Sequence, residues 1–238
     1  MIDEHDNHPP PFGSKELRLP DALRPALKKH LAGLRQHYEK NLHWGGRVGF
    51  GKRPALIVID LALAWTDPDS LPYGTNLDSI VEATCRLLDT ARHAAIPIFF
   101  TTSPHDAADQ PTPRKSRTEP RSLDEQSLEL DPRLDRRENE KIIYKHYASA
   151  FKGTNLIETL CALHVDTLIV TGVSTSHCVY ATCRDAKGSF RVIVGREAVG
   201  ERCELFHEVN LLDIEIDLAD VIPVDEIIEH LKGLARSG

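Results

Sequence analysis

The architecture of this chain follows from residues 167–179, which read Thr167-Leu168-Ile169-Val170-Thr171-Gly172-Val173-Ser174-Thr175-Ser176-His177-Cys178-Val179. The first half of this segment is an apolar run rich in β-branched residues, which is typical of a buried strand. The chain then turns at Gly172 through small and hydroxylic residues, and apolar residues at helical spacing follow from Val179 onward. We therefore predict that Cys178 lies where a strand ends and a helix begins.

Position gives Cys178 two possible roles. Free N–H groups and the positive end of the helix dipole point at the start of a helix, so a thiol there is expected to lose its proton more easily. Such a thiol is a better nucleophile. Most free cysteines, however, are small buried hydrophobic residues. The segment by itself leaves both interpretations open.

Strand and helix patterns alternate along the rest of the chain. Besides the strand that begins at Thr167, strands are predicted at residues 54–60, 96–102, 140–144, 190–194 and 220–223. Besides the helix that carries Cys178, helices are predicted at residues 77–95, 154–163, 201–216 and 224–234. Because the central strands are apolar throughout, both of their faces must be buried. The pattern predicts an α/β fold: a three-layer α-β-α sandwich around a mostly parallel six-stranded sheet.

The N-terminal part of the chain looks like an addition to this core. Residues 1–20 are polar and proline-rich and are expected to be loosely draped or without fixed structure. Residues 21–42 carry apolar residues at helical spacing, and a glycine-rich connector follows them. We therefore divide the chain into an N-terminal tail with an extra helix, residues 1–45, and a core domain, residues 46–238.

Composition excludes several classes of function. Of the 238 residues, 41% are hydrophobic and 27% charged, and the net charge is -7 with no basic block. Nucleic acid and anionic membranes are therefore not expected as partners. The apolar runs have the length of strands, and no signal peptide is apparent. The five cysteines lack a CxxC spacing, which argues against disulfides or a zinc finger and predicts a cytoplasmic location.

Three polar residues follow the ends of predicted strands. They are Asp60, Lys145 and Cys178. Because the carboxyl ends of parallel strands share one edge of the sheet, these side chains can meet although they are far apart in sequence. A carboxylate can accept the thiol proton and pass it to a leaving amine. A lysine ammonium favours the thiolate and the carboxylate, and backbone N–H groups before Cys178 can hold an oxyanion. Together they would support acyl transfer through a thioester, followed by hydrolysis.

The segments that carry these residues resemble motifs of the isochorismatase-like cysteine hydrolases. Those motifs are Arg53-Pro54-Ala55-Leu56-Ile57-Val58-Ile59-Asp60-Leu61, Tyr144-Lys145-His146-Tyr147-Ala148-Ser149-Ala150-Phe151 and Gly172-Val173-Ser174-Thr175-Ser176-His177-Cys178-Val179. Three further segments resemble the branch of that superfamily that hydrolyses N-carbamoylsarcosine. They read Gly49-Phe50-Gly51-Lys52-Arg53-Pro54, Ala64-Trp65-Thr66 and Ser149-Ala150-Phe151-Lys152-Gly153-Thr154-Asn155-Leu156. The resemblance covers about residues 45–225.

The resemblance implies a catalytic triad of Asp60, Lys145 and Cys178. It also implies a cis peptide bond between Val173 and Ser174, which in this superfamily turns the amides of Ser174 and Cys178 toward one oxyanion. Nicotinamidases of the superfamily carry an aspartate and two histidines as a metal site after the second strand. Here residues 101–106 contain a single histidine, so we expect neither a metal nor another cofactor.

Four residues are candidates for contact with the substrate. Arg202 matches the position that holds a substrate carboxylate in the carbamoylsarcosine branch, and a guanidinium suits that task; pairing with Glu201 or Glu204 at a helix start is the alternative. Thr175 offers a hydroxyl near the turn. Trp65 and Phe151 follow strand ends and could wall the pocket, although a core role is equally available. His177 lies beside the nucleophile and is left outside the triad.

The leading hypothesis is therefore a hydrolase of carbon–nitrogen bonds in linear amides, acting on a small amide or N-carbamoyl compound that bears a carboxylate. Alternatives are a maleamate-type amidase, a hydrolase of a larger amide such as streptothricin, or a non-catalytic interaction protein on this fold. The complete triad argues against the last. A homo-oligomer, dimer or tetramer, is expected from the resemblance. Loops 66–76 and 103–139 would shape the pocket, and the longer one is a candidate lid.

Overall fold

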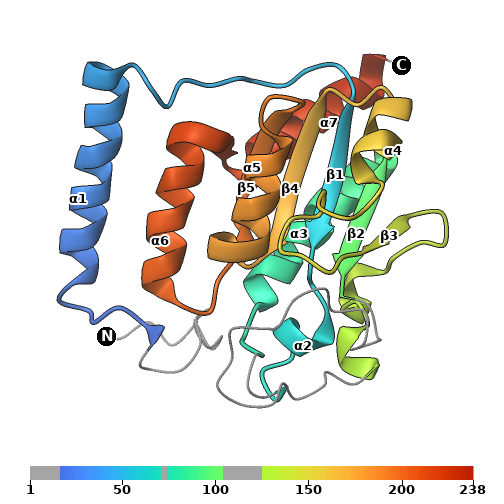
Figure 1. Ribbon diagram of the computed structural model, residues 1–238, viewed down its shortest axis with the longest axis horizontal. Coiled ribbons are helices and arrows are strands. Elements are labelled where there is room, and N and C mark those ends of the chain that lie inside the picture. Colours follow the sequence, from blue (N-terminus) through green and yellow to red (C-terminus); the bar gives the residue numbers. More distant parts are fainter. Residues whose placement is uncertain (1–16, 71–73, 104–124, 238) are drawn as a thin grey trace.

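The computed structural model describes residues 17–70, 74–103 and 125–237. Its centre is a six-stranded sheet with the strand order β3-β2-β1-β4-β5-β6, in which every neighbouring pair is parallel (Figure 1). The strands are β1 (Pro54–Ile59), β2 (Ile98–Thr102), β3 (Lys141–Tyr144), β4 (Thr167–Val173), β5 (Arg191–Gly200) and β6 (Asp220–Ile222). The predicted α/β fold with a parallel six-stranded sheet is confirmed.

Helices cover both faces of the sheet, because the central strands are apolar on both sides. In β1, Ala55, Ile57 and Ile59 pack into one core, and Leu56 and Val58 pack into the other. The first core is closed by α4 (Leu156–Ala162), α5 (Tyr180–Ala186), α6 (Glu204–Asp213) and η7 (Ile214–Leu218). The second is closed by α3 (Asp78–His93) and α7 (Val224–Ser237). These two layers of helices complete the expected sandwich.

Strand β5 is longer than the sequence predicts. It continues past Val194 to Gly200, after a shift of its register against β4 between Val170 and Gly172. The polar residues Arg196 and Glu197 interrupt the apolar pattern in this second half. As a result α6 begins at Glu204, and residues 201–203 form a turn at the end of the strand instead of the first turn of a helix.

The N-terminal helix stands outside the three layers. It consists of α1 (Arg24–His37) and a continuing π-helical turn, η2 (Tyr38–Leu42), which together match the predicted helix at 21–42. Figure 1 shows α1 beside α6, joined to β1 by a long extended segment. No residue of α1 is buried. The division of the chain at residue 45 stays a prediction.

Residues 17–20, expected to be loosely draped, instead include one residue that is buried and hydrogen-bonded. Leu19 is buried, and its N–H donates a 2.8 Å hydrogen bond to the Glu204 carboxylate. The rest of the predicted tail, residues 1–16, lies outside the described residues. The N-terminal segment is thus attached to the start of α6.

Of the predicted long loop, residues 103–139, the structure describes residue 103 and residues 125–139. The described part contains two short 3₁₀ turns, η4 (Gln126–Leu128) and η5 (Pro132–Leu134). Because residues 104–124 lie outside the described residues, the expectation that the loop 103–139 is a lid stays a prediction. Among the described helices, none combines the length and the apolar character needed to cross a bilayer.

Candidate active site

Asp60, Lys145 and Cys178 meet at the carboxyl ends of the strands. Asp60 directly follows β1, Lys145 directly follows β3, and Cys178 lies in η6 (Thr175–Val179), the π-helical turn after β4. The Lys145 Nζ atom lies 2.7 Å from Oδ2 of Asp60 and 3.3 Å from Sγ of Cys178. The structure thus brings together the three residues that the sequence places at strand ends.

The Asp60 carboxylate is held in one orientation. The residue is 4% exposed and has a positive φ of 52°, a conformation that aspartate tolerates better than most residues. Its N–H donates to the carbonyl and to Oγ1 of Thr101, each at 3.2 Å. The Thr101 hydroxyl in turn donates to Oδ1 of Asp60 at 2.6 Å. These contacts direct the other carboxylate oxygen, Oδ2, toward Lys145.

Lys145 is a buried cation between two acidic partners. Its Nζ also donates to the Tyr147 carbonyl at 3.3 Å, and its N–H donates to the Thr102 carbonyl at 2.9 Å. Burial works against the ammonium charge, but the nearby Asp60 and Cys178 outweigh it and raise the pKa of Lys145. Lys145 therefore stays protonated at neutral pH and serves as a fixed positive charge.

The Cys178 thiol holds its proton more tightly than the sequence led us to expect. Burial, followed by the negative charge of Asp60, raises its pKa to about 12, although Lys145 acts in the opposite direction. The prediction that the start of a helix lowers the pKa of Cys178 is therefore wrong. Burial of the thiol raises this pKa by more than Lys145 and the short π-helical turn lower it. A nucleophilic role for Cys178 would therefore require a base that removes this proton.

The turn before Cys178 depends on a glycine. Gly172 has a φ of 105°, and a Cβ atom at this position would lie 2.0 Å from the carbonyl oxygen of Ile59. One residue further along, the Val173–Ser174 peptide bond is cis, as the resemblance implied. The Ser174 carbonyl accepts from the N–H groups of His177 at 2.9 Å and Val179 at 3.1 Å. The use of the Ser174 and Cys178 amides as an oxyanion hole stays a prediction.

The Thr175 hydroxyl is already engaged by contacts within the protein. Its side chain is fully buried, its hydroxyl donates to the Gly200 carbonyl at 2.9 Å, and it lies 3.0 Å from Nδ1 of His207. Burial lowers the pKa of His207, which favours the neutral ring beside this hydroxyl. These contacts join the turn that carries Cys178 to β5 and α6. They favour a structural role for Thr175 over the predicted contact with substrate.

Arg202 is exposed at the end of β5. The alternative pairings of its side chain do not form among the described residues. Glu201 instead accepts the backbone N–H of Arg202 at 3.0 Å, and Glu204 is occupied by Arg24, whose Nε lies 2.6 Å from its Oε1. The guanidinium is therefore available for a ligand, and its role as a carboxylate clamp stays a prediction.

The two aromatic candidates are only partly buried. Trp65 lies in α2 (Leu63–Thr66), which follows β1, and packs against the core that α3 and α7 close. Phe151 packs against the other core, with its ring 6.1 Å from that of Phe190. Phe151 thus has an evident packing role. Contact of either residue with substrate stays a prediction.

Sequence reasoning missed two residues next to this site. Thr101 pairs with Ile59 across β1 and β2 and fixes the Asp60 carboxylate. Glu201 is 4% exposed and accepts hydrogen bonds from both the N–H and the hydroxyl of Ser176. A polar residue at the end of an apolar strand was the signal for Thr101. The signal for Glu201 was hidden, because the end of β5 was predicted to be a helix.

The described residues contain no group of three or more His, Cys, Asp or Glu side chains placed to hold a metal ion. His105 and Asp106, in the region compared with the metal site of nicotinamidases, lie outside the described residues. The expectation of a metal-free site therefore stays a prediction. All five cysteines are free thiols, as predicted from their spacing.

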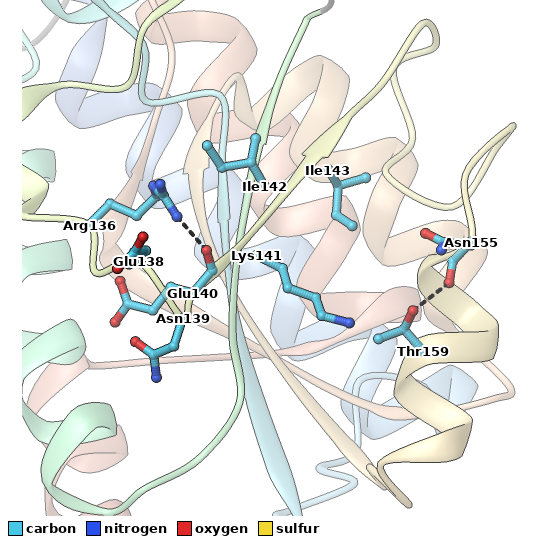
Figure 2. Close-up of a pocket in the computed structure, with 9 residues that line it drawn as sticks. All are labelled: Arg136, Glu138, Asn139, Glu140, Lys141, Ile142, Ile143, Asn155 and Thr159. Atoms are coloured by element: carbon cyan, nitrogen blue, oxygen red, sulfur yellow. Dashed lines mark hydrogen bonds between the residues drawn. The ribbon is translucent and has the colours of Figure 1, made fainter.

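A cavity of about 430 Å³ lies away from these three residues. It opens beside the edge strand β3 and the start of α4, and Arg136, Lys141 and Asn155 are among its lining residues (Figure 2). Its buried carboxylate, Glu140, is already paired with Arg92 at 2.8 Å. None of Asp60, Lys145 and Cys178 lines this cavity, so it is separate from the candidate active site.

Comparison with known proteins adds three findings. The isochorismatase domain model matches residues 54–226. The chain is 35% identical to an N-carbamoylsarcosine amidase from Arthrobacter sp over 235 residues, covering 94% of this chain and 87% of that protein. It is also 35% identical to a maleamate amidohydrolase from Pseudomonas putida, covering 81% of this chain and 93% of that protein.

Solved structures agree on the fold. A cysteine hydrolase from Pseudomonas syringae pv. phaseolicola superposes with a TM-score of 0.70 at 22% sequence identity, covering 79% of this chain and 97% of that chain. At this identity the likeness concerns the fold alone.

Proposed function

This chain belongs to the isochorismatase family and is a hydrolase of carbon–nitrogen bonds in linear amides, and we propose that its substrate is a small amide or ureido compound that carries a carboxylate. We propose further that the reaction passes through a thioester on Cys178 and releases ammonia. A compound of the N-carbamoylsarcosine type is the first candidate.

One observation carries this proposal. The Lys145 Nζ atom lies 2.7 Å from Oδ2 of Asp60 and 3.3 Å from Sγ of Cys178. A base, a cation and a nucleophile therefore lie next to one another at the carboxyl edge of the sheet. Because the thiol has a pKa of about 12, a general base must remove its proton as the carbon–sulfur bond forms. We propose that the Asp60 carboxylate, held by Thr101, takes this proton, and the side-chain hydrogen bond with Asp60 that helps to raise the pKa of Cys178 supports this role.

In the first half of the reaction, Sγ of Cys178 attacks the amide carbon while its proton passes to Asp60. The carbonyl oxygen becomes an oxyanion, which the backbone amides of Ser174 and Cys178 would hold. The carbon–nitrogen bond then breaks, and Asp60 gives its proton to the leaving nitrogen, which departs as ammonia. Lys145 keeps its proton throughout, and its charge favours the ionised forms of both neighbours.

In the second half, water attacks the thioester carbon and gives its proton to Asp60. The carbon–sulfur bond breaks, and the proton returns to Sγ. The acid product leaves, and the thiol and the carboxylate are restored to their starting forms. Asp60 thus acts in turn as base and acid in both halves.

The carboxylate of the substrate would be held by Arg202. Its exposed guanidinium stands two residues before the start of α6, on the turn that also anchors Ser176 through Glu201. A planar cation with paired donors suits a carboxylate. A maleamate-type substrate also bears an amide and a carboxylate. The equal identity to a maleamate amidohydrolase makes this the second candidate.

The test is to measure ammonia release from N-carbamoylsarcosine, maleamate and nicotinamide. We expect turnover of at least one of the two carboxylates, complete loss in Cys178→Ala, and normal turnover in Cys161→Ala. Cys161 is an exposed thiol on α4 and provides the matched control. Full turnover by Cys178→Ala would remove the nucleophile assignment, and turnover of nicotinamide alone would remove the carboxylate requirement.

We also propose that the protein is a cytoplasmic homo-oligomer. Three apolar residues on α6 are exposed, namely Leu205, Phe206 and Val209, and a second copy would cover them. Light scattering of the purified protein would give its mass. A monomer at micromolar concentration would contradict the oligomer.

A further inference from the structure

Two buried carboxylates flank the turn between β5 and α6, which carries Arg202. Glu201 is 4% exposed and Glu204 is 3% exposed. A buried carboxylate needs partners, because losing its hydration is costly. The hydrogen-bond partners of Glu201 and Glu204 come from different parts of the chain. The turn is therefore fixed by contacts at both of its ends.

Glu201 fixes the turn that carries Cys178, η6. Its Oε2 atom accepts from the Ser176 hydroxyl at 2.5 Å and from the Ser176 N–H at 3.1 Å, while Oε1 accepts from the Arg202 N–H at 3.0 Å. Ser176 lies two residues before Cys178 in η6. The same carboxylate therefore joins the backbone that presents Cys178 to the backbone that presents Arg202.

Glu204 holds the N-terminal segment, residues 17–24. Arg24 approaches it in a bidentate manner, with Nε 2.6 Å from Oε1 and Nη2 3.0 Å from Oε2, and the Leu19 N–H donates to Oε2 at 2.8 Å. Arg24 also donates to the Leu19 carbonyl at 3.0 Å. These contacts lower the pKa of Glu204, so the pair is ionised at neutral pH.

We propose that the N-terminal segment, residues 17–24, positions the active site from outside the family domain, which spans residues 54–226. The Arg24–Glu204 pair fixes the turn at residues 201–204. Because Glu201 in this turn is hydrogen-bonded to Ser176 and to the Arg202 N–H, fixing the turn also fixes Arg202 and the turn that carries Cys178. Arg24, Glu204 and Glu201 are positioning residues and do not touch the reacting atoms. Only the kinetic test of this proposal depends on the proposed function.

The chain offers a matched control for this ion pair. Arg92 and Glu140 form a bidentate pair with the same contacts, Nε 2.8 Å from Oε1 and Nη2 3.0 Å from Oε2, although the Arg92 side chain is only 6% exposed and that of Arg24 is 33% exposed. That pair joins α3 to the start of β3, away from the Cys178 turn. Loss of either pair should destabilise the fold, but only loss of the first should disturb the turn that carries Cys178.

The experiment compares Arg24→Met with Arg92→Met at a temperature where both are folded by circular dichroism. We expect both to lower Tm, but only Arg24→Met to raise KM for a carboxylate substrate, by about tenfold or more, because it frees the turn that carries Arg202. Arg92→Met can lower kcat through β3 and Lys145 but should leave KM unchanged. Arg24→Lys should recover part of the increase in KM. An equal KM in Arg24→Met and Arg92→Met would overturn the proposal.

A second readout needs no substrate. Amide hydrogen exchange of the peptide that contains residues 174–180 should be faster in Arg24→Met and in Glu201→Gln than in wild type, and unchanged in Arg92→Met. Glu201→Gln keeps the test informative if Arg24→Met does not fold. If no amide is hydrolysed but exchange follows this pattern, the proposed function fails while the positioning role stands. Unchanged exchange in Glu201→Gln would overturn the positioning role.

Discussion

The Thr101 hydroxyl donates a 2.6 Å hydrogen bond to Oδ1 of Asp60. Because Oδ1 is engaged there, the carboxylate presents Oδ2 to Lys145 at 2.7 Å. One oxygen of the Asp60 side chain thus holds the carboxylate in place, and the other faces Lys145. This division makes Thr101 a direct means of testing how much the orientation of Asp60 matters.

Replacing Thr101 with valine keeps the shape of the side chain and removes its hydroxyl. We expect stability to fall by about 1 kcal/mol, the usual net value of one buried hydrogen bond. We expect kcat to fall by about tenfold, since Asp60 can then turn away from the thiol. Urea unfolding and steady-state kinetics measure the two effects. Thr171→Val, whose hydroxyl donates to the Ile57 carbonyl at 3.3 Å, is the control and should keep its kcat.

Replacing Lys145 with methionine leaves Asp60 as a buried carboxylate without its cation. Breaking a buried ion pair in this way costs about 3–5 kcal/mol, and we expect activity to be lost as well. The double variant Lys145→Met with Asp60→Asn should be less destabilised than the sum of the two single variants, because no unpaired charge remains. Chemical denaturation of the four proteins gives the coupling. Additive losses would contradict an ion pair, and exposed Lys141→Met should change little.

The raised pKa of Cys178 predicts how its reactivity depends on pH. Because the thiol of the free protein titrates at about 12, its alkylation by iodoacetamide should still rise about tenfold per pH unit between pH 7 and 9. The alkylation rate of a simple thiol rises less steeply as the pH approaches its ordinary pKa of 9.0. Mass spectrometry of the Cys178 peptide, with Cys178→Ala as the blank, measures the rate. A plateau below pH 8 would show that a thiolate is already present.

The same shift has a consequence for stability. The pKa of Cys178 is higher in the folded protein than the ordinary thiol value of 9.0, so the folded state favours the bound proton. Its contribution to stability is therefore complete below pH 9 and is lost as the pH rises toward 12. Buried Cys183, whose pKa is also raised to about 12, contributes in the same direction.

Arg202→Ala should raise KM for a carboxylate substrate by about tenfold or more, as loss of one partner of a charged pair does. Turnover of an amide without a carboxylate should be unaffected. Arg53→Ala, an exposed arginine at the opposite end of the sheet, is the matched control. An unchanged KM in Arg202→Ala would remove this residue from the binding site.

The core of the fold and the meeting of Asp60, Lys145 and Cys178 were predictable, because each depends on a local pattern. An apolar run marks a strand, and a polar residue after it marks a strand end. Parallel strands then place those ends at one edge. No long-range information was needed beyond the parallel arrangement itself.

Other features depend on packing that a local pattern does not contain. The second half of β5 contains Arg196 and Glu197, so its strand character is hidden in the sequence. The burial that raises the pKa of Cys178 is a property of the surrounding core. The hydroxyl of Thr175 is turned inward by contacts with Gly200 and His207, which come from elements far along the chain.

The cation of the site comes from the edge of the sheet. Lys145 follows β3, a strand of four residues that pairs within the described sheet with β2 alone. Edge elements open with less free energy than central ones. Fraying of β3 would remove the Lys145 ammonium from the site while the core stays folded. Enzymatic activity would therefore report the local opening of β3, and it would vanish before global unfolding begins.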